Sequence, residues 1–232
     1  MVGGVEMTVV ALRRYPVKSM GGEPMRTVPV DGRGLSGDRW YAVEDGEGHF
    51  ASGKNTRRFR RRDAVFRYAA TTNGNEVVVT GHGGVWKAGD PSLDEELSQA
   101  MGTSVAVTPE RDVPHQDMGA VSLISTATLE WCANRWGIDA DPRRLRANIV
   151  FAAEEPFVEE QWQGRLLVVG EARLRVVERA PRCRMIDIVQ DGAWPGGRWL
   201  KPLAAERDMC LAMYADVDAA GFISVGDRVS VE

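Results

Sequence analysis

The sequence has 232 residues, of which 44% are hydrophobic and 27% are charged, and its formal net charge is −4. This composition is typical of a globular protein with one large domain or two small ones. The acidic balance argues against nucleic-acid binding, and no apolar run approaches the roughly 18 residues that span a bilayer. Because no signal-peptide pattern opens the chain, we expect a cytoplasmic protein that does not bind membranes.

Most of the chain is predicted to form β-strands. Short β-branched runs, each ended by Gly, Asn, Asp or Pro, predict strands over residues 7–17, 39–45, 65–71, 75–81 and 104–110. The stretch "TNGNE" predicts a tight hairpin turn at Asn73-Gly74. Many short strands with regular turns are typical of a barrel or a sandwich.

Two helices interrupt the strands. Asp90 followed by Pro91 is typical of a helix start, and the pattern predicts a helix over residues 91–101 that ends at Gly102. Ser125 or Thr126 is expected to cap a second helix, which runs to residue 136.

The second predicted helix ends at Gly137, a residue type that favours helix termination. Its residues Leu129, Cys132 and Trp136 are three and four positions apart and therefore share one face. We expect that face, including the Cys132 thiol, to lie in the core.

Three further segments complete the chain. Two alternating runs over residues 165–180, joined at Gly170-Glu171, predict a hairpin, and residues 221–232 predict closing strands. The weakly patterned stretch "RDVPHQDMG" at 111–119 could link the parts of the fold or cover a site. The basic run at 54–67 is interpreted as a solvated edge, with docking of an acidic partner or a phosphate contact as alternatives.

The lone thiol of Cys183 stands between Arg182 and Arg184 in "RAPRCRMIDI". A core cysteine needs no cations beside it, whereas a thiolate is stabilised by them and becomes a nucleophile or a soft metal ligand. The three cysteines form no CxxC pair and the three histidines are far apart, which argues against a zinc or iron–sulfur site built by this chain alone.

Other polar residues follow or begin predicted strands. Lys18 and Ser19 end "YPVKS", Arg39 follows the Gly-rich turn in "GLSGDRW", and Arg146 and Asn148 alternate into the apolar run of "RLRANIV". Each has an ordinary structural explanation on its own. Together with Arg182 they suit a phosphate and a planar, donor-rich heterocycle.

These stretches resemble the MOSC superfamily, named for the C-terminal domain of molybdenum cofactor sulfurases. More closely, the chain resembles bacterial relatives of the mitochondrial amidoxime-reducing component, which carry an N-terminal MOSC β-barrel domain. The matching segments cover nearly the whole chain: "YPVKSMGGEPM", "GRGLSGDRWYAVEDGEGHF", "VSLISTATLEW", "RLRANIVF", "EEQWQGRLLVVGEARLRVVERAPRC" and "GFISVGDRV". The resemblance implies a mainly β fold with a few helices. It implies an N-terminal β-barrel-like domain at 1–92 and a MOSC β-barrel domain at 93–232, with a cofactor in the cleft between them.

The resemblance also implies a site. Cys183 would be the catalytic residue and would ligate the molybdenum of a molybdenum–molybdopterin cofactor; pyridoxal phosphate is not expected. The residues implied to contact the pterin or its phosphate are Lys18, Ser19, Arg39, Arg146, Asn148 and Arg182, with Lys54 of "ASGK" as a further basic contact.

The implied activity is that of a molybdenum-cofactor-dependent oxidoreductase. It would reduce N-oxygenated small molecules, such as N-hydroxylated ones, with electrons from a separate reductase and a small carrier, because the chain shows no flavin or iron–sulfur pattern of its own.

The chain departs from the family pattern beside its cysteine. Pro181 replaces a common serine, and "RMIDIVQDG" replaces a stretch of the type Thr-Thr-Val-Asp-Pro, so Asp187 and Asp191 need not match the aspartate of that stretch. Two alternatives therefore remain open. The chain could be a sulfur carrier with a persulfide on Cys183, or a non-catalytic MOSC binding protein with a structural Cys183.

Overall fold

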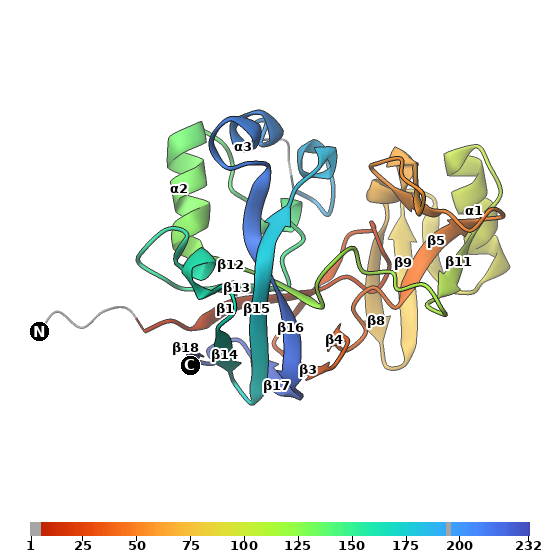
Figure 1. The fold of residues 1–232 in the computed structure, drawn as a ribbon. Coiled ribbons are helices and arrows are strands. Elements are labelled where there is room, and N and C mark those ends of the chain that lie inside the picture. The colour runs from red at the N-terminus through yellow and green to blue at the C-terminus, as the bar shows by residue number, and fades with distance from the viewer. Residues whose placement is uncertain (1–5, 194–195) are drawn as a thin grey trace, which may run out of the picture.

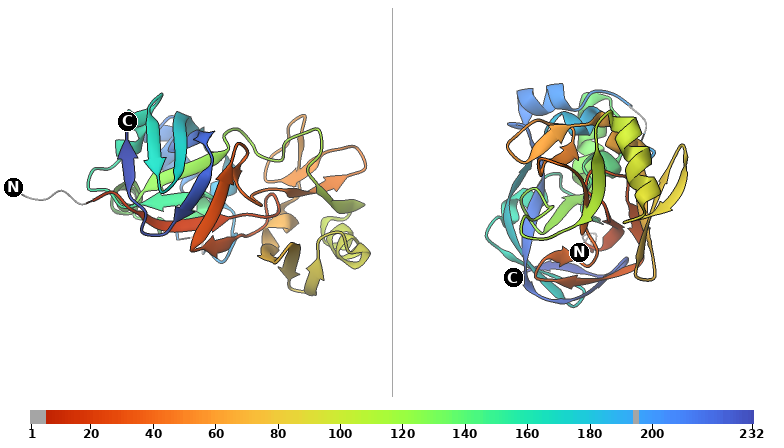
Figure 2. Two further views of the ribbon diagram at one scale, coloured as in Figure 1. Left: turned by 90° about the horizontal axis from the view of Figure 1, so that it is seen from below. Right: turned by 90° about the vertical axis from the view of Figure 1, so that its right-hand side faces the viewer.

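The computed structural model describes residues 6–193 and 196–232. This part of the chain forms eighteen strands, three α-helices and four short 3₁₀ helices, arranged in two lobes that lie side by side (Figures 1 and 2). The predicted fold class, mainly β with a few helices, is confirmed. No helix within the described residues is both long and apolar enough to cross a membrane.

An eight-stranded sheet forms the centre of the first lobe. Its order is β18, β14, β15, β16, β12, β13, β1 and β2, and neighbours are antiparallel except for the parallel pair β12 and β13. The strands are β1 (Val9–Arg14), β2 (Glu23–Met25), β12 (Val121–Ser125), β13 (Ile149–Phe151), β14 (Leu166–Val169), β15 (Ala172–Pro181), β16 (Cys210–Ala219) and β18 (Val229–Val231). The named strands alone do not close this sheet into a ring in the described part of the chain. An isolated antiparallel bridge nevertheless pairs Thr8, just before β1, with Arg228, just before β18, and Val229 N donates to Met7 O at 2.8 Å.

Both faces of this sheet are buried. One face packs against the small sheet of β17 (Gly221–Ser224), β3 (Thr27–Asp31) and β4 (Gly34–Leu35), which contributes Val28 and Ile223 to the core. The other face packs with α2 (Thr126–Trp136) and α3 (Leu200–Glu206), where Cys132 and Leu203 are fully buried. The 3₁₀ helices η2 (Pro142–Arg144), η3 (Val158–Trp162) and η4 (Arg184–Asp187) belong to the loops of this lobe.

The second lobe holds two smaller sheets and α1 (Pro91–Met101). One sheet is β11 (Val105–Pro109), β5 (Tyr41–Asp45), β6 (Phe50–Ser52) and β7 (Phe59–Arg61); the other is β10 (Gly84–Lys87), β9 (Glu76–Gly81) and β8 (Ala69–Asn73). Leu93 and Leu97 of α1 pack with Val43, Phe66 and Val79 in the core between them.

Two segments of the chain connect the lobes. Residues 15–22 leave β1 and pair with the second lobe, where Lys18 N donates to Tyr41 O at 2.8 Å and Gly21 N donates to Tyr68 O at 2.8 Å. Residues 110–120 return from β11 to β12 and cross between the lobes in Figure 1. Strands from before and after residue 92 thus share each lobe, and the division into units 1–92 and 93–232 stays a prediction.

Several predicted elements match the observed bounds. Both predicted α-helices begin and end as expected: Asp90 and Ser125 cap them through their side chains, and Gly102 and Gly137 end them in the left-handed conformation. The hairpin at residues 165–180 is also confirmed, with Val169 opposite Ala172.

Two strand predictions are wrong in detail, and one strand was not predicted. Residues 65–67 belong to the 3₁₀ helix η1 (Asp63–Arg67), where Val65 and Phe66 are both buried, so the apolar run is not a strand. The strand expected to contain Arg146 begins only at Ile149. The central strand β16 carries no regular alternation and was not predicted.

Candidate functional site

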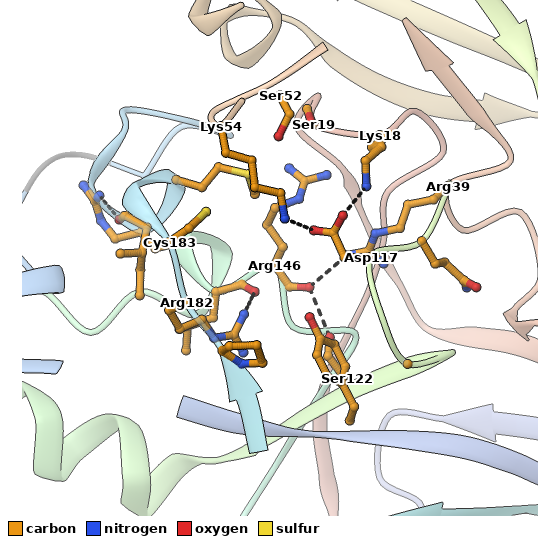
Figure 3. Close-up of a pocket in the computed structure, with 18 of the residues that line it drawn as sticks. Lys18, Ser19, Arg39, Ser52, Lys54, Asp117, Ser122, Arg146, Arg182 and Cys183 are labelled. Carbon is orange, nitrogen blue, oxygen red and sulfur yellow. Dashed lines mark hydrogen bonds and ion pairs between the residues drawn. The ribbon is translucent and has the colours of Figure 1, made fainter. Parts of the chain in front are cut away.

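A pocket lies at the junction of the two lobes (Figure 3). It is lined by residues of both lobes and of both connecting segments. All eight predicted site residues line it: Lys18, Ser19, Arg39, Lys54, Arg146, Asn148, Arg182 and Cys183. The sequence therefore identified one continuous surface from segments that are up to 165 residues apart, between Lys18 and Cys183.

The pocket lining is strongly cationic. Among its described residues, six carry a cationic side chain and one carries a carboxylate, Asp117; the cations are Lys18, Arg39, Lys54, Arg144, Arg146 and Arg182. Such a concentration of positive charge between low-dielectric walls attracts anions, and guanidinium groups are well suited to phosphate oxygens.

Three of the site residues have a strained backbone. Ser19, Arg39 and Arg146 have φ values of 68°, 54° and 54°, in the left-handed region that non-glycine residues avoid. Each such residue costs free energy that the surrounding structure must offset, and these conformations concentrate at binding and catalytic sites. In this chain they turn two guanidinium side chains and a hydroxyl into one pocket.

Arg146 is a buried cation with backbone and aromatic neighbours. Arg146 is only 5% exposed, and its Nη1 donates to Met20 O at 2.7 Å. Its guanidinium carbon lies 4.1 Å from the centre of the Tyr15 ring. Its Nη2 is buried and has no hydrogen-bond partner within the described residues. Burial, with the nearby Arg39 charge, lowers the pKa of Arg146 to about 10. Arg146 also lines the pocket, so its charge acts on an anion bound there.

Arg39 has a carboxylate partner of its own. Its Nη1 donates to Asp38 Oδ2, and Asp38 is fully buried. Asp38 also accepts a hydrogen bond from Tyr15 N at 2.8 Å. This bond fixes the turn that carries Asp38 and Arg39 against the segment that begins at Tyr15. Burial acts to lower the pKa of Arg39, but the Asp38 carboxylate raises it overall, so the guanidinium stays charged.

The two lysines of the pocket share one acidic partner. Lys18 Nζ lies 2.8 Å from Asp117 Oδ1, and Lys54 Nζ lies 3.6 Å from Asp117 Oδ2 (Figure 3). Both ammonium groups lie 4.7 Å from the centre of the Phe59 ring. Burial lowers the pKa of Lys18 to about 8, although Asp117 opposes this shift.

The cysteine is half-buried and points into the pocket (Figure 3). The two arginines that flank it in the sequence make different contacts. Arg182 donates to the backbone oxygens of Leu145 and Leu211, at 2.9 and 2.6–2.8 Å, and lines the pocket. Arg184 instead pairs with Asp63 in the second lobe at 2.7 Å. Of the two guanidinium groups beside the thiol, one is therefore a contact between the lobes.

Ser19 and Asn148 line the pocket but are bonded within the protein. Ser19 Oγ donates to Ala51 O at 3.0 Å. Asn148 Oδ1 accepts from Ser122 N and Oγ at 3.1 and 3.0 Å, and its Nδ2 donates to Arg13 O at 3.2 Å. The Asn148 contacts join β1 and β12 beside the start of β13, and the Ser19 contact joins residues 15–22 to β6. Both residues therefore have a structural role beneath the pocket.

Sequence reasoning missed several residues of the lining, including Asp117, Ser122, Arg144 and Tyr214. Asp117 belongs to the stretch 111–119, whose lack of pattern was consistent with a segment that covers a site. In the sequence, Ser122 is an ordinary polar residue within the apolar strand β12, and Tyr214 lies on strand β16, which was not predicted. Nothing in their local sequence distinguishes either of them.

Sequence profiles of two domains match this chain. The MOSC domain matches residues 110–230, and the MOSC N-terminal beta barrel domain matches residues 6–86. A molybdenum cofactor sulfurase from Danio rerio is 24% identical over 82% of this chain, which spans 29% of the length of that relative.

One solved structure shows a similar fold. The YuaD protein from Bacillus subtilis is 13% identical, with a TM-score of 0.51 over 100% of this chain and 98% of that one. The YiiM protein from Escherichia coli is 10% identical, with a TM-score of 0.44 over 98% of this chain and 68% of that one. At 13% identity the likeness to YuaD concerns the fold alone, and nothing is concluded from the match to YiiM.

Proposed function

The chain belongs to the MOSC domain family, and from this premise we propose that it is an oxidoreductase that holds a molybdenum–molybdopterin cofactor in the pocket between its lobes. The observation that carries the proposal is the combination of a thiol, Cys183, with six cationic side chains in the lining of one pocket. A ligand that carries both a phosphate and a thiolate-binding metal would use both kinds of group.

The donors of the pocket fit such a cofactor. Arg146 lines the pocket, and its guanidinium is suited to donate to a phosphate oxygen or to the carbonyl of a heterocycle. Lys18, Lys54 and Arg39 line the same pocket and would complete the anion site. The relative named as a molybdenum cofactor sulfurase is consistent with a chain that handles this cofactor.

Cys183 would be the protein ligand of the metal. Within the described residues, no cluster of three or more His, Cys, Asp or Glu side chains could hold a metal ion. A metal in this pocket would therefore take most of its ligands from the cofactor and one soft donor from Cys183. Arg182, the residue next to the proposed ligand Cys183, is held by the backbone oxygens of Leu145 and Leu211. The thiol therefore projects from a fixed part of the backbone.

The chemistry that the bound cofactor supplies is the two-electron removal of oxygen from an N-oxygenated small molecule. For an N-hydroxylated substrate, two electrons and two protons convert the N–OH bond to N–H and release water. Because no further redox centre is proposed in this chain, the electrons would come from a separate reductase through a small carrier. The protein supplies the binding site, the orientation of the cofactor and the soft ligand.

The experiment is elemental analysis of protein made in a host that synthesises the molybdenum cofactor. We expect about one molybdenum per chain and a pterin released on denaturation. Metal-free protein that carries a persulfide on Cys183 would overturn the proposal and favour a sulfur carrier. Metal-free protein with an unmodified thiol would overturn it in favour of a non-catalytic binding protein.

A further inference from the structure

Asp117 brings the one carboxylate among the described lining residues into a cationic pocket. It lies in residues 113–118, here called the strap, within the segment that crosses between the lobes. Figure 3 shows its carboxylate between the ends of Lys18 and Lys54. The carboxylate thus occupies the position that an anionic ligand of the two lysines would take.

The strap is anchored at its base. His115 is 2% exposed, its ring packs on Phe50 with 4.8 Å between centroids, and its backbone nitrogen donates to Glu110 Oε2 at 2.6 Å. Arg58 donates to Gln116 O at 3.3 Å. None of these contacts involves the Asp117 side chain.

The tip of the strap is held mainly by charge. The Asp117 side chain is 33% exposed, and it forms ion pairs with Lys18 and Lys54. Lys18 also donates to His115 O at 2.6 Å, so this ammonium keeps a backbone partner when the carboxylate moves away. The Asp117 side chain can therefore exchange its place for another anion while the anchored base remains folded.

Ionisation keeps this contact in place at neutral pH. Burial raises the pKa of the Asp117 carboxyl, but the charges of Lys18, Lys54 and Arg39 outweigh burial and hold that pKa well below its usual range. The carboxylate neutralises part of the positive field at one end of the pocket. At the other end, Arg146 and Arg182 donate to backbone oxygens.

We propose that Asp117 is an internal anion that competes with the anionic ligand of the pocket for Lys18 and Lys54, and so sets the affinity of the pocket. The inference rests on the proposed function only in that the pocket binds an anion. Binding would replace the Asp117 contacts to both lysines by contacts to the ligand. A dianionic group, such as a phosphate monoester, displaces the carboxylate more readily than a monoanion because it gains twice the charge interaction.

The test uses sulfate, a tetrahedral dianion across the neutral pH range, titrated calorimetrically into the full-length, cofactor-free chain at pH 6.5. Asp117→Asn should bind sulfate about tenfold more tightly than the wild type, because removing a charge a few ångströms from the anion is an effect of this size. Asp117→Glu retains the charge and should stay within about threefold of the wild type. Asp112→Asn, a change at an exposed aspartate of the same segment, is the matched control and should leave the affinity unchanged.

Equal or weaker sulfate binding by Asp117→Asn would overturn the proposal. Asp117→Ser gives the same comparison if the asparagine variant folds poorly, as judged by circular dichroism. The molybdenum assay of the proposed function is a separate measurement. A chain without molybdenum whose Asp117→Asn variant binds sulfate more tightly would sink only the proposed function, and the reverse pair of results would sink only this inference.

Discussion

At the scale of single residues, the loss of stability on removing a buried charge depends on the group that the charge is paired with. Arg39 neutralises Asp38, which is fully buried, whereas the Arg146 guanidinium donates to a backbone oxygen and stacks on Tyr15. Arg39 therefore holds a buried ion pair in addition to lining the pocket.

The two arginines give a matched pair of substitutions. Arg39→Met leaves the Asp38 carboxylate buried without its cation and should lower the free energy of unfolding by about 3 kcal/mol or more. Arg146→Met removes a buried cation that lacks a carboxylate partner, and stability should change by no more than about 1 kcal/mol. Urea denaturation measures both, and equal losses of stability would contradict this interpretation.

Lys18 makes anion binding depend on pH. Burial lowers its pKa to about 8, and the charged groups that face it are Asp117, Arg39 and Lys54. The protonated form binds anions, so sulfate affinity should be highest below pH 7 and fall as the pH rises through about 8. Titrations from pH 6 to pH 9 measure this, with Lys18→Met as control. A wild-type affinity that is constant over this range, or a step of equal size in the variant, would show that another group titrates.

At the scale of elements, local signals decided what the sequence could predict. The helix caps depend on residues next to the helix, so α1 and α2 could be predicted to within a residue. Strand β16 could not be predicted because its pairing with β15 shifts register at three places and Ala212 has a φ of 71°. These irregularities interrupt the alternation that identifies a strand.

The site likewise contains residues that local sequence could predict and residues that only the fold shows. Short motifs that resemble those of a known family predicted eight residues, and the structure places all eight in the lining of one pocket, while their roles stay predictions. Asp117 could not be assigned because its position in the pocket depends on how the strap folds over Phe50. The partner of Arg39 is its sequence neighbour, but only the fold shows that Asp38 is buried.

The two helix caps differ in burial and should differ in energy. Ser125 is fully buried and its Oγ accepts from Thr128 N at 3.1 Å, whereas Asp90 caps α1 at the surface through Ser92 N at 3.0 Å. Ser125→Ala should lower the free energy of unfolding by about 2 kcal/mol, and Asp90→Ala by about 1 kcal/mol or less. Chemical denaturation measures both changes, and a larger loss for Asp90→Ala would show that burial does not decide the energy of these caps.

At the scale of the whole molecule, the pocket exists because the two lobes are joined. Residues 15–22 and the strap link the lobes at the pocket, and the Arg184–Asp63 ion pair joins them beside Cys183. The thiol is thus held at a junction, while Cys132 lies in the core of one lobe. The two cysteines should therefore respond differently to the same substitution.

Cys183→Ala should abolish the proposed activity and change the free energy of unfolding by less than about 0.5 kcal/mol, because the thiol is half-buried at a pocket. Cys132→Ala is the control. Its thiol is fully buried, and the cavity should cost about 1 kcal/mol while the specific activity of the folded protein stays unchanged. Activity lost in both variants in proportion to stability would indicate a structural Cys183.

The central claim is that Cys183 binds molybdenum in the cationic pocket, and X-ray absorption at the molybdenum edge tests it most directly. The samples are wild-type protein and Cys183→Ala from a host that makes the cofactor, matched for pterin content. We predict that the metal of the wild type has one more sulfur neighbour than that of the variant, or that the variant has lost the metal altogether. An identical number of sulfur neighbours and an identical molybdenum content in the two proteins would contradict the account.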